Sequence, residues 1–246
     1  MTLELSSCTY SYRPWSPPVL TGLDYSLGPG LTILLGPNGA GKSTLLRLAA
    51  AVAYPRTGTV IYNGISSHSK AYRAAVAWMP QQITAMTGLT AREQVAYSGW
   101  LKGMNKREAW DSAAQALSRV DLAPQAGVKA KRLSGGQLRR VGVASALVHN
   151  ARVLLLDEPT AGMDPRQRRV FRDVLATLAD DVQVLLATHD VADLAEECDQ
   201  VTVVDAGSIV FTGDTHEFLG HAPAGTAPGR LAEAAYSELS NTGAYL

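Results

Sequence analysis

The sequence predicts an α/β protein with a mainly parallel sheet, an antiparallel side sheet and an inserted α-helical lobe. Apolar runs of strand length alternate with helical signals through most of the 246 residues, a pattern typical of parallel sheets covered by helices. Two runs, Val153–Leu156 and Val182–Ala187, carry apolar residues on both faces, which indicates central strands. From about 89 to 150 the signals are mainly helical, which predicts the inserted lobe.

The remaining elements flank these central strands. Leu31–Leu35 is a further buried strand, and Thr44–Val52 is the helix that follows it. Short strands of a side sheet and a closing hairpin are predicted at Leu3–Leu27, Thr59–Tyr62, Val201–Val204 and Ser208–Thr212. After Gly220 the chain is rich in Ala, Gly and Pro, with one helical segment predicted at Arg230–Leu239.

Helix starts are marked by local capping signals. In a capping box, a side chain at the helix start and one three residues later each satisfy a free backbone N–H. Proline at the first helical position is a second signal, because its missing N–H has no partner there anyway. Four starts carry such signals: Thr90 with Glu93, Asn105 with Glu108, Ser134 with Gln137, and Asp164 followed by Pro165.

The bulk composition limits the classes of protein to consider. The chain is 46% hydrophobic and 18% charged, so it can bury one sizeable core but is too short for two ordinary domains plus linkers. The formal net charge is +0, so no global basic field makes nucleic acid an expected partner. Cys8 and Cys198 are far apart and are expected to be free thiols. We expect neither a secretory signal nor a membrane span, because no apolar run is long enough.

A phosphate-binding loop is the first chemical motif. Gly36–Ser43 fits the pattern G-x-x-x-x-G-K-[ST], between an apolar strand and a helix. Glycines allow the backbone N–H groups to turn toward phosphate oxygens, and the helix start adds a positive dipole end. The expected nucleotide-binding residues are Gly36, Pro37, Asn38, Gly39, Ala40, Gly41, Lys42, Ser43 and Thr44. Within this set Lys42 should reach the β- and γ-phosphates, Ser43 should ligate Mg²⁺ and Thr44 should contact the α-phosphate.

Two carboxylates end the strand at Val153–Leu156. Because side chains alternate along a strand, Asp157 and Glu158 are expected to do different work. Phosphoryl transfer depends on positioning and charge stabilisation, so one metal, one lysine and one carboxylate can suffice. We therefore expect Asp157 to hold Mg²⁺ and Glu158 to polarise the attacking water.

The sequence Leu133–Gln137, LSGGQ, is the most specific motif. Ser134, Gly135 and Gly136 at a helix start make a second anion-binding surface. With this motif the chain resembles ABC transporter ATP-binding subunits, and the resemblance covers about Tyr12 to Gly213. The helical lobe resembles that of bacterial exporters. The resemblance implies a P-loop NTPase fold with a RecA-like core, ATP and Mg²⁺ as ligands, and hydrolysis of ATP.

The resemblance also assigns further site residues. It implies that Ser134, Gly135, Gly136, Gln137 and Asp164 contact the ATP held by a second subunit. Gln81 resembles the glutamine that contacts Mg²⁺ and water and links to the membrane partner, with Gln82 as the adjacent alternative. Tyr12 resembles the aromatic residue that stacks on adenine, in competition with Tyr10 and Trp15. His189 resembles the switch histidine at the γ-phosphate, while His68, His149, His216 and His221 match no motif.

One departure from the family pattern concerns the loop that crosses between subunits. It reads Ala-Gly-Met-Asp at 161–164, where many relatives have Ser-Gly-Leu-Asp or Ser-Ala-Leu-Asp. Methionine conserves the volume of leucine, but the missing serine hydroxyl removes one polar contact. No catalytic position is missing, and Lys42, Glu158 and His189 are expected to be catalytic.

These patterns lead to a functional hypothesis. Residues 1–220 would form an ATP-binding domain, with the helical lobe at about 89–150, and 221–246 a short C-terminal tail. The domain would close with a copy or a close homologue on two ATP and drive a separate polytopic membrane subunit from the cytoplasmic face of the membrane. The lobe favours export, by analogy of fold alone. The alternatives are a soluble ABC-type ATPase acting on a protein assembly scaffold and a regulatory module that binds ATP without hydrolysing it.

Overall fold

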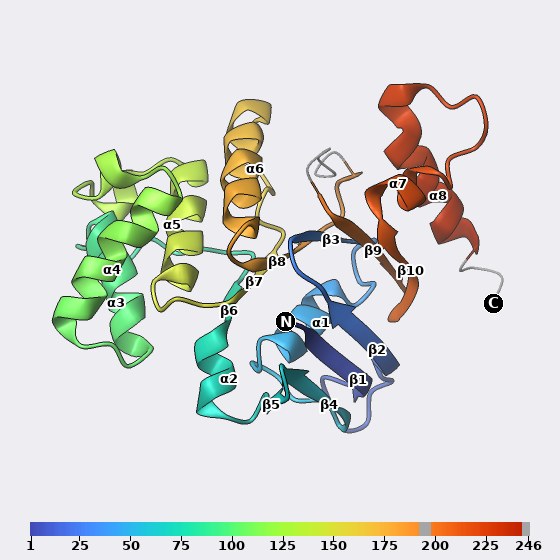
Figure 1. Cartoon of the computed structure of the whole chain (residues 1–246), viewed down its shortest axis with the longest axis horizontal. Helices are drawn as coiled ribbons and strands as arrows, with labels where there is room; N and C mark the ends of the chain where they lie inside the picture. The colour runs from blue at the N-terminus through green and yellow to red at the C-terminus, as the bar shows by residue number, and fades with distance from the viewer. Residues whose placement is uncertain (192–197, 243–246) are drawn as a thin grey trace.

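Two sheets and a group of helices make up the fold, seen in a computed structural model that describes residues 1–191 and 198–242 (Figure 1). The larger sheet has the spatial order β10 (Ser208–Asp214), β9 (Gln200–Asp205), β3 (Leu31–Leu35), β8 (Gln183–Thr188), β7 (Val153–Asp157) and β6 (Val76–Met79). The smaller sheet has the order β2 (Leu20–Leu27), β1 (Leu3–Tyr10), β4 (Thr57–Tyr62) and β5 (Ile65–Ser66). The predicted fold class is confirmed.

Helices connect and cover these strands. The α-helices are α1 (Lys42–Ala49), α2 (Lys70–Ala75), α3 (Ala91–Leu101), α4 (Lys106–Arg119), α5 (Gly135–Leu147), α6 (Pro165–Ala179), α7 (Thr215–Leu219) and α8 (Leu231–Thr242). Short 3₁₀ turns are η1 (Ala123–Gln125), η2 (Ala130–Arg132) and η4 (Pro228–Arg230). The sequence analysis did not predict α2 or β6, which span only 6 and 4 residues and are too short for a clear periodic signal.

The larger sheet is parallel from β9 to β6, and β10 pairs antiparallel with β9 as the predicted hairpin. Strands β3, β7 and β8 are buried at every residue, as the apolar runs predicted. All pairs in the smaller sheet are antiparallel. The predicted combination of a parallel core sheet and an antiparallel side sheet is therefore what the chain forms.

Two hydrophobic cores lie on opposite faces of the parallel strands. In β3, Ile33 and Leu35 face the core that includes α5 and α6, whereas Leu34 faces the core that includes α1 and the smaller sheet. Helix α1 therefore lies between the two sheets (Figure 1). Each fully buried leucine contributes about 1.5 to 3 kcal/mol relative to an exposed one, so burial on both faces fixes these strands firmly.

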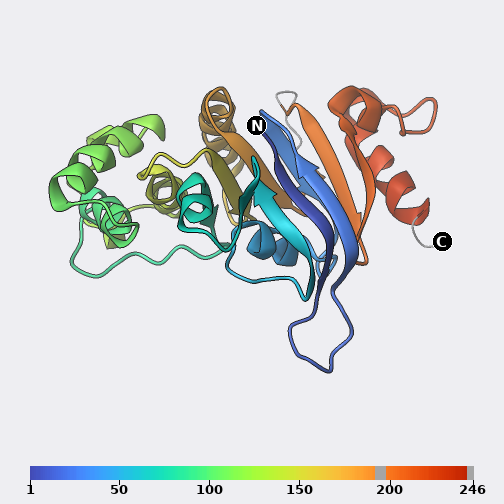
Figure 2. The ribbon, with the colours of Figure 1, turned by 60° about the horizontal axis from the view of Figure 1, so that its bottom comes forward.

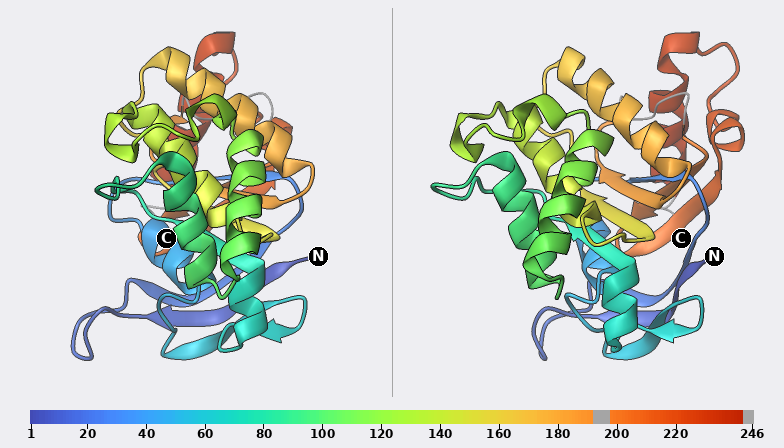
Figure 3. Two further views of the ribbon diagram at one scale, coloured as in Figure 1. Left: turned by 90° about the vertical axis from the view of Figure 1, so that its left-hand side faces the viewer. Right: turned by 60° about the vertical axis from the view of Figure 1, so that its left-hand side comes forward.

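The helical lobe consists of α3, α4 and α5 and stands apart from the smaller sheet (Figure 3). Its three helix starts carry the predicted capping boxes. At Thr90, the hydroxyl accepts from the Glu93 N–H at 3.2 Å, and the Glu93 carboxylate accepts from the Thr90 N–H at 2.6 Å. Reciprocal pairs also cap α4 at Asn105 and α5 at Ser134. Each cap stabilises its helix by about 1 kcal/mol, so local sequence alone sets where the lobe helices begin.

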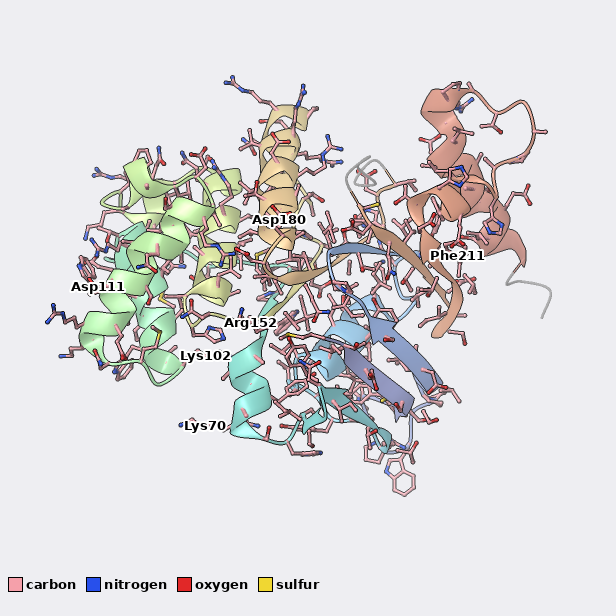
Figure 4. The ribbon with its side chains drawn as sticks, in the orientation of Figure 1. Lys70, Lys102, Asp111, Arg152, Asp180 and Phe211 are labelled. Carbon is pink, nitrogen blue, oxygen red and sulfur yellow. The ribbon has the colours of Figure 1, made fainter. Side chains whose placement is uncertain are left out.

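The C-terminal region packs against the hairpin end of the larger sheet. Helix α8 contacts α7, β9 and β10, and Ala235 within it is fully buried. On β10, Phe211 lies toward this region (Figure 4), with its ring centroid 5.8 Å from that of Phe218. The helix predicted at Arg230–Leu239 is confirmed; residues 243–246 of the predicted tail lie outside the described residues.

Two expectations from composition can be compared with the structure. Cys8 and Cys198 are both buried free thiols, as predicted. Within residues 1–191 and 198–242, none of the helices combines the length and hydropathy that crossing a bilayer requires.

A half-buried histidine links the fold to pH. His149 follows α5, and both of its ring nitrogens are buried without a hydrogen-bond partner in the described part of the chain. Burial lowers the pKa of His149 from 6.5 to about 4, and the positive charge of Lys102 adds to this shift. Lys102 lies at the junction of the lobe with α2 (Figure 4). Between these values the unfolded chain binds a proton that the folded chain does not, so acidification favours unfolding.

We predict that His149→Leu makes the stability less sensitive to acid. Between pH 7 and pH 4 the free energy of unfolding of the natural chain should fall by about 2 to 3 kcal/mol more than that of the variant. Urea denaturation at several pH values measures both curves. Parallel curves would contradict the assignment of this proton to His149.

Candidate nucleotide site

The predicted catalytic residues meet where four neighbouring parallel strands end. Leu35 of β3 pairs with Thr188 of β8, and Asp157 of β7 pairs with Ala187 of β8. Strand β6 pairs with β7 up to Met79, two residues before Gln81. Since parallel strands end at the same edge, the loops that follow them are brought together.

The phosphate loop joins β3 to α1. Gly41 caps α1 with φ 105°, and no side chain accepts from the first N–H groups of this helix. A Cβ at Gly41 would lie 2.8 Å from Leu20 Cδ2, so both the conformation and the packing require glycine. By contrast, side chains cap α3, α4, α5, α6 and α7. The free N–H groups at the start of α1 therefore form an anion-binding position.

Lys42 lies buried over its own loop. Its Nζ donates to the carbonyl oxygens of Gly36 at 2.6 Å and Pro37 at 3.1 Å, and lies 3.7 Å from Glu158 Oε1. Burial lowers the pKa of Lys42, while the negative charges of Glu158 and Asp157 counteract this shift. The ammonium group is thus held at the phosphate loop by acceptors that phosphate oxygens can replace.

The Ser43 hydroxyl and the Asp157 carboxylate form an oxygen-rich pair. Ser43 Oγ donates to Asp157 Oδ1 at 2.9 Å. Burial raises the pKa of Asp157, and the hydrogen bond from Ser43 partly offsets that shift. Mg²⁺ in proteins commonly takes one or two carboxylates together with substrate phosphates, so these two oxygens suit it.

Glu158 lies between a lysine and a histidine. One carboxylate oxygen is near Lys42, and the other lies 2.9 Å from His189 Nδ1. The ionised carboxylate only accepts hydrogen bonds, so Nδ1 is the donor in that state. The Glu158 side chain is 9% exposed, whereas that of His189 is 50% exposed. This arrangement fixes the direction of a buried carboxylate and leaves the histidine accessible from solvent.

The backbone of Glu158 is strained. Its φ of 48° is in the left-handed region, which costs a non-glycine residue about 1 to 3 kcal/mol. The Glu158 N–H donates to the Ala187 carbonyl at 2.9 Å, and surrounding contacts therefore hold the residue in place. Such strain at a carboxylate that faces a phosphate loop is a feature of functional sites.

A pocket of about 300 Å³ extends from the phosphate loop to the loop after β6. Tyr12 lines it, with its hydroxyl 2.8 Å from Thr44 Oγ1, whereas neither Tyr10 nor Trp15 is among the lining residues. The loop between β1 and β2, which contains Tyr12, projects from the molecule (Figure 2). The lining residues are Tyr12, Val19, Pro37, Asn38, Gly39, Gly41, Lys42, Ser43, Thr44, Gln81 and Glu158.

The two adjacent glutamines have different surroundings. Gln81 lines the nucleotide pocket, whereas Gln82 lines a separate groove beside the helical lobe. The remaining predicted nucleotide-loop residues, Gly36 and Ala40, shape the loop from within. A Cβ at Gly36 would lie 2.3 Å from the Val204 carbonyl oxygen, which explains the absence of a side chain there.

The residues of the LSGGQ motif lie elsewhere, in a second pocket. This pocket, of about 340 Å³, is lined by Ser134, Gly136, Gln137 and Asp164 among others, and it shares no lining residue with the nucleotide pocket. Gly135 is exposed next to it. Ser134 caps α5, and Asp164 caps α6 through a 2.8 Å hydrogen bond from the Gln167 N–H. One chain thus carries two separate pockets, each beside a helix start.

Sequence analysis missed two residues at the site. Val19 lines the nucleotide pocket, and nothing in its local sequence distinguishes it. Arg139, on α5, donates to the carbonyl oxygens of Gln81, Glu158 and Ala161. Its position two residues after Gln137 was the available signal, but only the folded structure reveals the three acceptors.

Comparisons with known proteins show the family of the chain. A family model described as ABC transporter matches residues 20–161. The uncharacterised ABC transporter ATP-binding protein YxlF of Bacillus subtilis is 35% identical over 184 residues, which are 75% of this chain and 61% of YxlF. The methionine import ATP-binding protein MetN of Caulobacter vibrioides is 34% identical, over 88% of this chain and 68% of MetN. The Nod factor export ATP-binding protein I of Rhizobium meliloti is 33% identical, over 89% of this chain and 66% of that protein.

The chain spans 61% to 68% of the length of these three relatives. Among solved structures, the dimeric structure of MJ0796, a bacterial ABC transporter cassette, matches with a TM-score of 0.74 and 25% identity, over 86% of this chain and 98% of that one. The cbiO1 protein of Clostridium perfringens, part of the cbiONQ complex, matches with a TM-score of 0.78 and 25% identity, over 89% of this chain and 90% of that one. By the family model, its relatives and its fold, the chain belongs to the ABC transporter family and is an ABC ATPase cassette.

Proposed function

We propose that this chain binds and hydrolyses ATP as one half of a closing pair, and thereby drives a separate membrane subunit. The observation that carries the proposal is the separation of the two pockets. One pocket holds the phosphate loop, and the other lies at the starts of α5 and α6. A second copy facing the first would bring Ser134 and Gly136 of one protomer over the nucleotide of its partner. The solved dimer of MJ0796 supports this arrangement by analogy.

Mg²⁺ is the proposed metal, held by Ser43 and Asp157, with Gln81 nearby in the pocket. Both side chains in the bonded pair offer oxygen, which is the donor that Mg²⁺ prefers. When bound, the ion neutralises charge on the phosphate oxygens. Tyr12 is proposed to hold adenine, because it lines the pocket and is 52% exposed.

Glu158 is the proposed general base. It would accept the proton of the attacking water while Lys42 stabilises charge on the phosphate oxygens. The hydrogen bond from His189 directs the carboxylate, and His189 is exposed enough to reach the γ-phosphate. In the closed pair, ATP would contact both subunits and would therefore bind more tightly than in the open pair. Hydrolysis removes the γ-phosphate that joins the two subunits, so the pair would reopen.

The membrane partner is proposed to bind beside the helical lobe. A groove of about 420 Å³ includes Gln82 and Ile83, which follow directly after Gln81 in the chain. Its rim on α3 exposes Leu101, while Tyr97 and Trp100 are 40% and 52% exposed on the same helix. A cytoplasmic segment of a polytopic membrane subunit in this groove would hold the chain at the inner face of the cell membrane. Nucleotide-dependent motion at Gln81 would then reach that segment directly.

Export is the proposed direction, on the resemblance of the helical lobe. The relatives favour neither direction, because a methionine import protein and a Nod factor export protein match at 34% and 33% identity.

The pairing predicts a specific effect of Glu158→Gln. Glutamine keeps the size of the side chain but is not a base, so kcat for ATP hydrolysis should fall by about 10²- to 10⁴-fold. ATP should then convert the variant from monomer to dimer in size-exclusion chromatography with light scattering. Hydrolysis at the natural rate would remove Glu158 from the mechanism.

Crosslinking in the same variant tests the geometry of the pair. Cysteines at Ser134 and Asn38, both exposed, should crosslink between subunits when ATP is present. Asn38 is preferred to Gly39, whose φ of 88° disfavours a side chain. The buried Cys8 and Cys198 serve as the unmodified background. No crosslink at saturating ATP would reject the composite site.

Lys42→Ala should weaken nucleotide binding. Loss of a charged donor to phosphate costs about 1.5 to 3 kcal/mol, so the Kd of ATP should rise by about 10- to 100-fold. Isothermal titration calorimetry measures the Kd, and Lys70→Ala, an exposed lysine outside the pocket, is the control. An unchanged Kd would count against the phosphate loop as the nucleotide site.

Leu101→Asp should separate ATP chemistry from membrane attachment. Leu101 is 62% exposed at the groove, so the change should cost less than about 0.5 kcal/mol of stability. The variant should retain ATP hydrolysis but no longer co-purify with a polytopic membrane protein encoded beside it. Val52→Asp, at a residue 50% exposed outside the groove, is the matched control. Equal co-purification of both variants would place the partner elsewhere, and a soluble scaffold as the only partner would favour the non-transport alternative.

A further inference from the structure

Arg139 connects two loops that meet at the nucleotide site, the loop after β6 and the loop between β7 and α6. Its Nη1 donates to the carbonyl oxygens of Gln81 at 3.1 Å and Glu158 at 3.2 Å, and its Nη2 donates to the Ala161 carbonyl at 2.6 Å. The Gln81 carbonyl lies in the loop after β6, and the Glu158 and Ala161 carbonyls both lie in the loop between β7 and α6. A single guanidinium group thus bonds to the backbone of two of the loops at the catalytic edge.

The Glu158 carbonyl is the most consequential of the three acceptors. Glu158 is in the left-handed conformation, with φ 48°, so its peptide orientation is not the one that the residue prefers. The same oxygen also accepts from the Ala161 N–H, at a long 3.3 Å. Arg139 therefore supplies the charged hydrogen bond at this strained peptide, and charged donors bind carbonyl oxygens more strongly than neutral ones.

We propose that Arg139 is a positioning residue for hydrolysis, which holds the Glu158 carboxylate between Lys42 and His189. It acts through the backbone and touches neither nucleotide nor water. The proposal rests on the role of Glu158 as general base. Because Ser134 caps α5, Arg139 would also connect the surface that meets the second nucleotide with the carboxylate that acts on the first.

The neighbouring arginine shows that this connection is specific. Arg140 donates to the Val120 and Asp121 carbonyl oxygens and lies 3.6 Å from the Asp121 carboxylate. It therefore joins α5 to the end of α4, within the lobe. Of these two consecutive side chains, only Arg139 is bonded to the catalytic loops.

The bonding pattern requires a guanidinium group. Two nitrogens in a rigid planar fork satisfy three carbonyls from three directions. A lysine ammonium is a single point on a flexible stem, so it can bond one or two of them but cannot hold all three in register. Arg139→Lys therefore keeps the positive charge but removes the planar fork that bonds three carbonyl oxygens at once.

The test compares Arg139→Lys and Arg139→Ala with Arg92→Lys. Arg92 is the matched control, because its guanidinium donates twice to the Trp110 carbonyl within the lobe, outside both pockets. We expect kcat for ATP hydrolysis to fall by about 10- to 100-fold in both Arg139 variants, as displacement of a catalytic group by about 1 Å does. The KM for ATP should stay within about threefold, and Arg92→Lys should retain the natural kcat.

Chemical rescue distinguishes positioning from general loss of structure. Methylguanidine should restore part of kcat in Arg139→Ala, and it should not do so in Glu158→Gln. In the double variant Arg139→Lys with Glu158→Gln, ATP should still produce the dimer, because the lesion affects hydrolysis and not closure. A natural kcat in Arg139→Lys, or a KM that rises in step with the fall in kcat, would overturn the proposal.

Unfolding of the variants and failure of the proposed function can be told apart from failure of the role of Arg139. If both Arg139 variants unfold, as circular dichroism would reveal, Arg139 is structural and the proposal is wrong. If the natural chain neither hydrolyses ATP nor dimerises as Glu158→Gln, the proposed function fails first. If the natural chain is active and Glu158→Gln is not, an active Arg139→Lys rejects only the role of Arg139.

Discussion

The hydrogen-bond register of the parallel sheet is the constraint on which the site depends. Pairing of β3, β8, β7 and β6 in adjacent positions brings the phosphate loop, His189, Glu158 and Gln81 to one edge, although these segments are far apart in sequence. The register holds because β3, β7 and β8 are buried on both faces, so a slip of one residue would move each side chain into the wrong core. Packing of the buried strands therefore determines where the site residues lie at the edge of the sheet.

The same architecture places helix starts in two separate pockets. The start of α1 faces one pocket, and the starts of α5 and α6, at Ser134 and Asp164, line the other. All three are helix N-termini, and each suits negative charge. Only α1 lacks a side-chain cap among these three, so in the proposed function the ligand itself would complete this helix end. The α5 start keeps its own cap, and in the proposed pair it would complement a phosphate held by the partner.

Local features of the fold could be predicted from the sequence, and long-range features could not. The capping boxes at Thr90 and Ser134 were found because the interacting residues are three positions apart. Strand β6 was missed, since its position depends on pairing with β7 and not on its four residues. At the site, motif spacing identified the phosphate loop and Glu158, whereas the contacts of Arg139 join residues 19 to 58 positions apart. Such contacts exist only once the sheet has brought the loops together.

Helix α5 shows how these levels combine. Its 13 residues span about 20 Å, and it contacts three functional regions along that length. Ser134 precedes its first turn at the second pocket, Arg139 bonds the catalytic loops, and Gly142 lies against the loop after β6. A Cβ at Gly142 would come within 2.8 Å of Ile83, so a side chain there would displace either the Ile83 side chain or α5. Because a helix moves as a rigid body, a displacement at one end changes the hydrogen bonds and packing at the others. The contacts along α5 therefore join the second pocket, the backbone of Glu158 and the loop after β6. In the proposed pair, these contacts would connect closure over nucleotide with the catalytic carboxylate and with the groove beside the lobe.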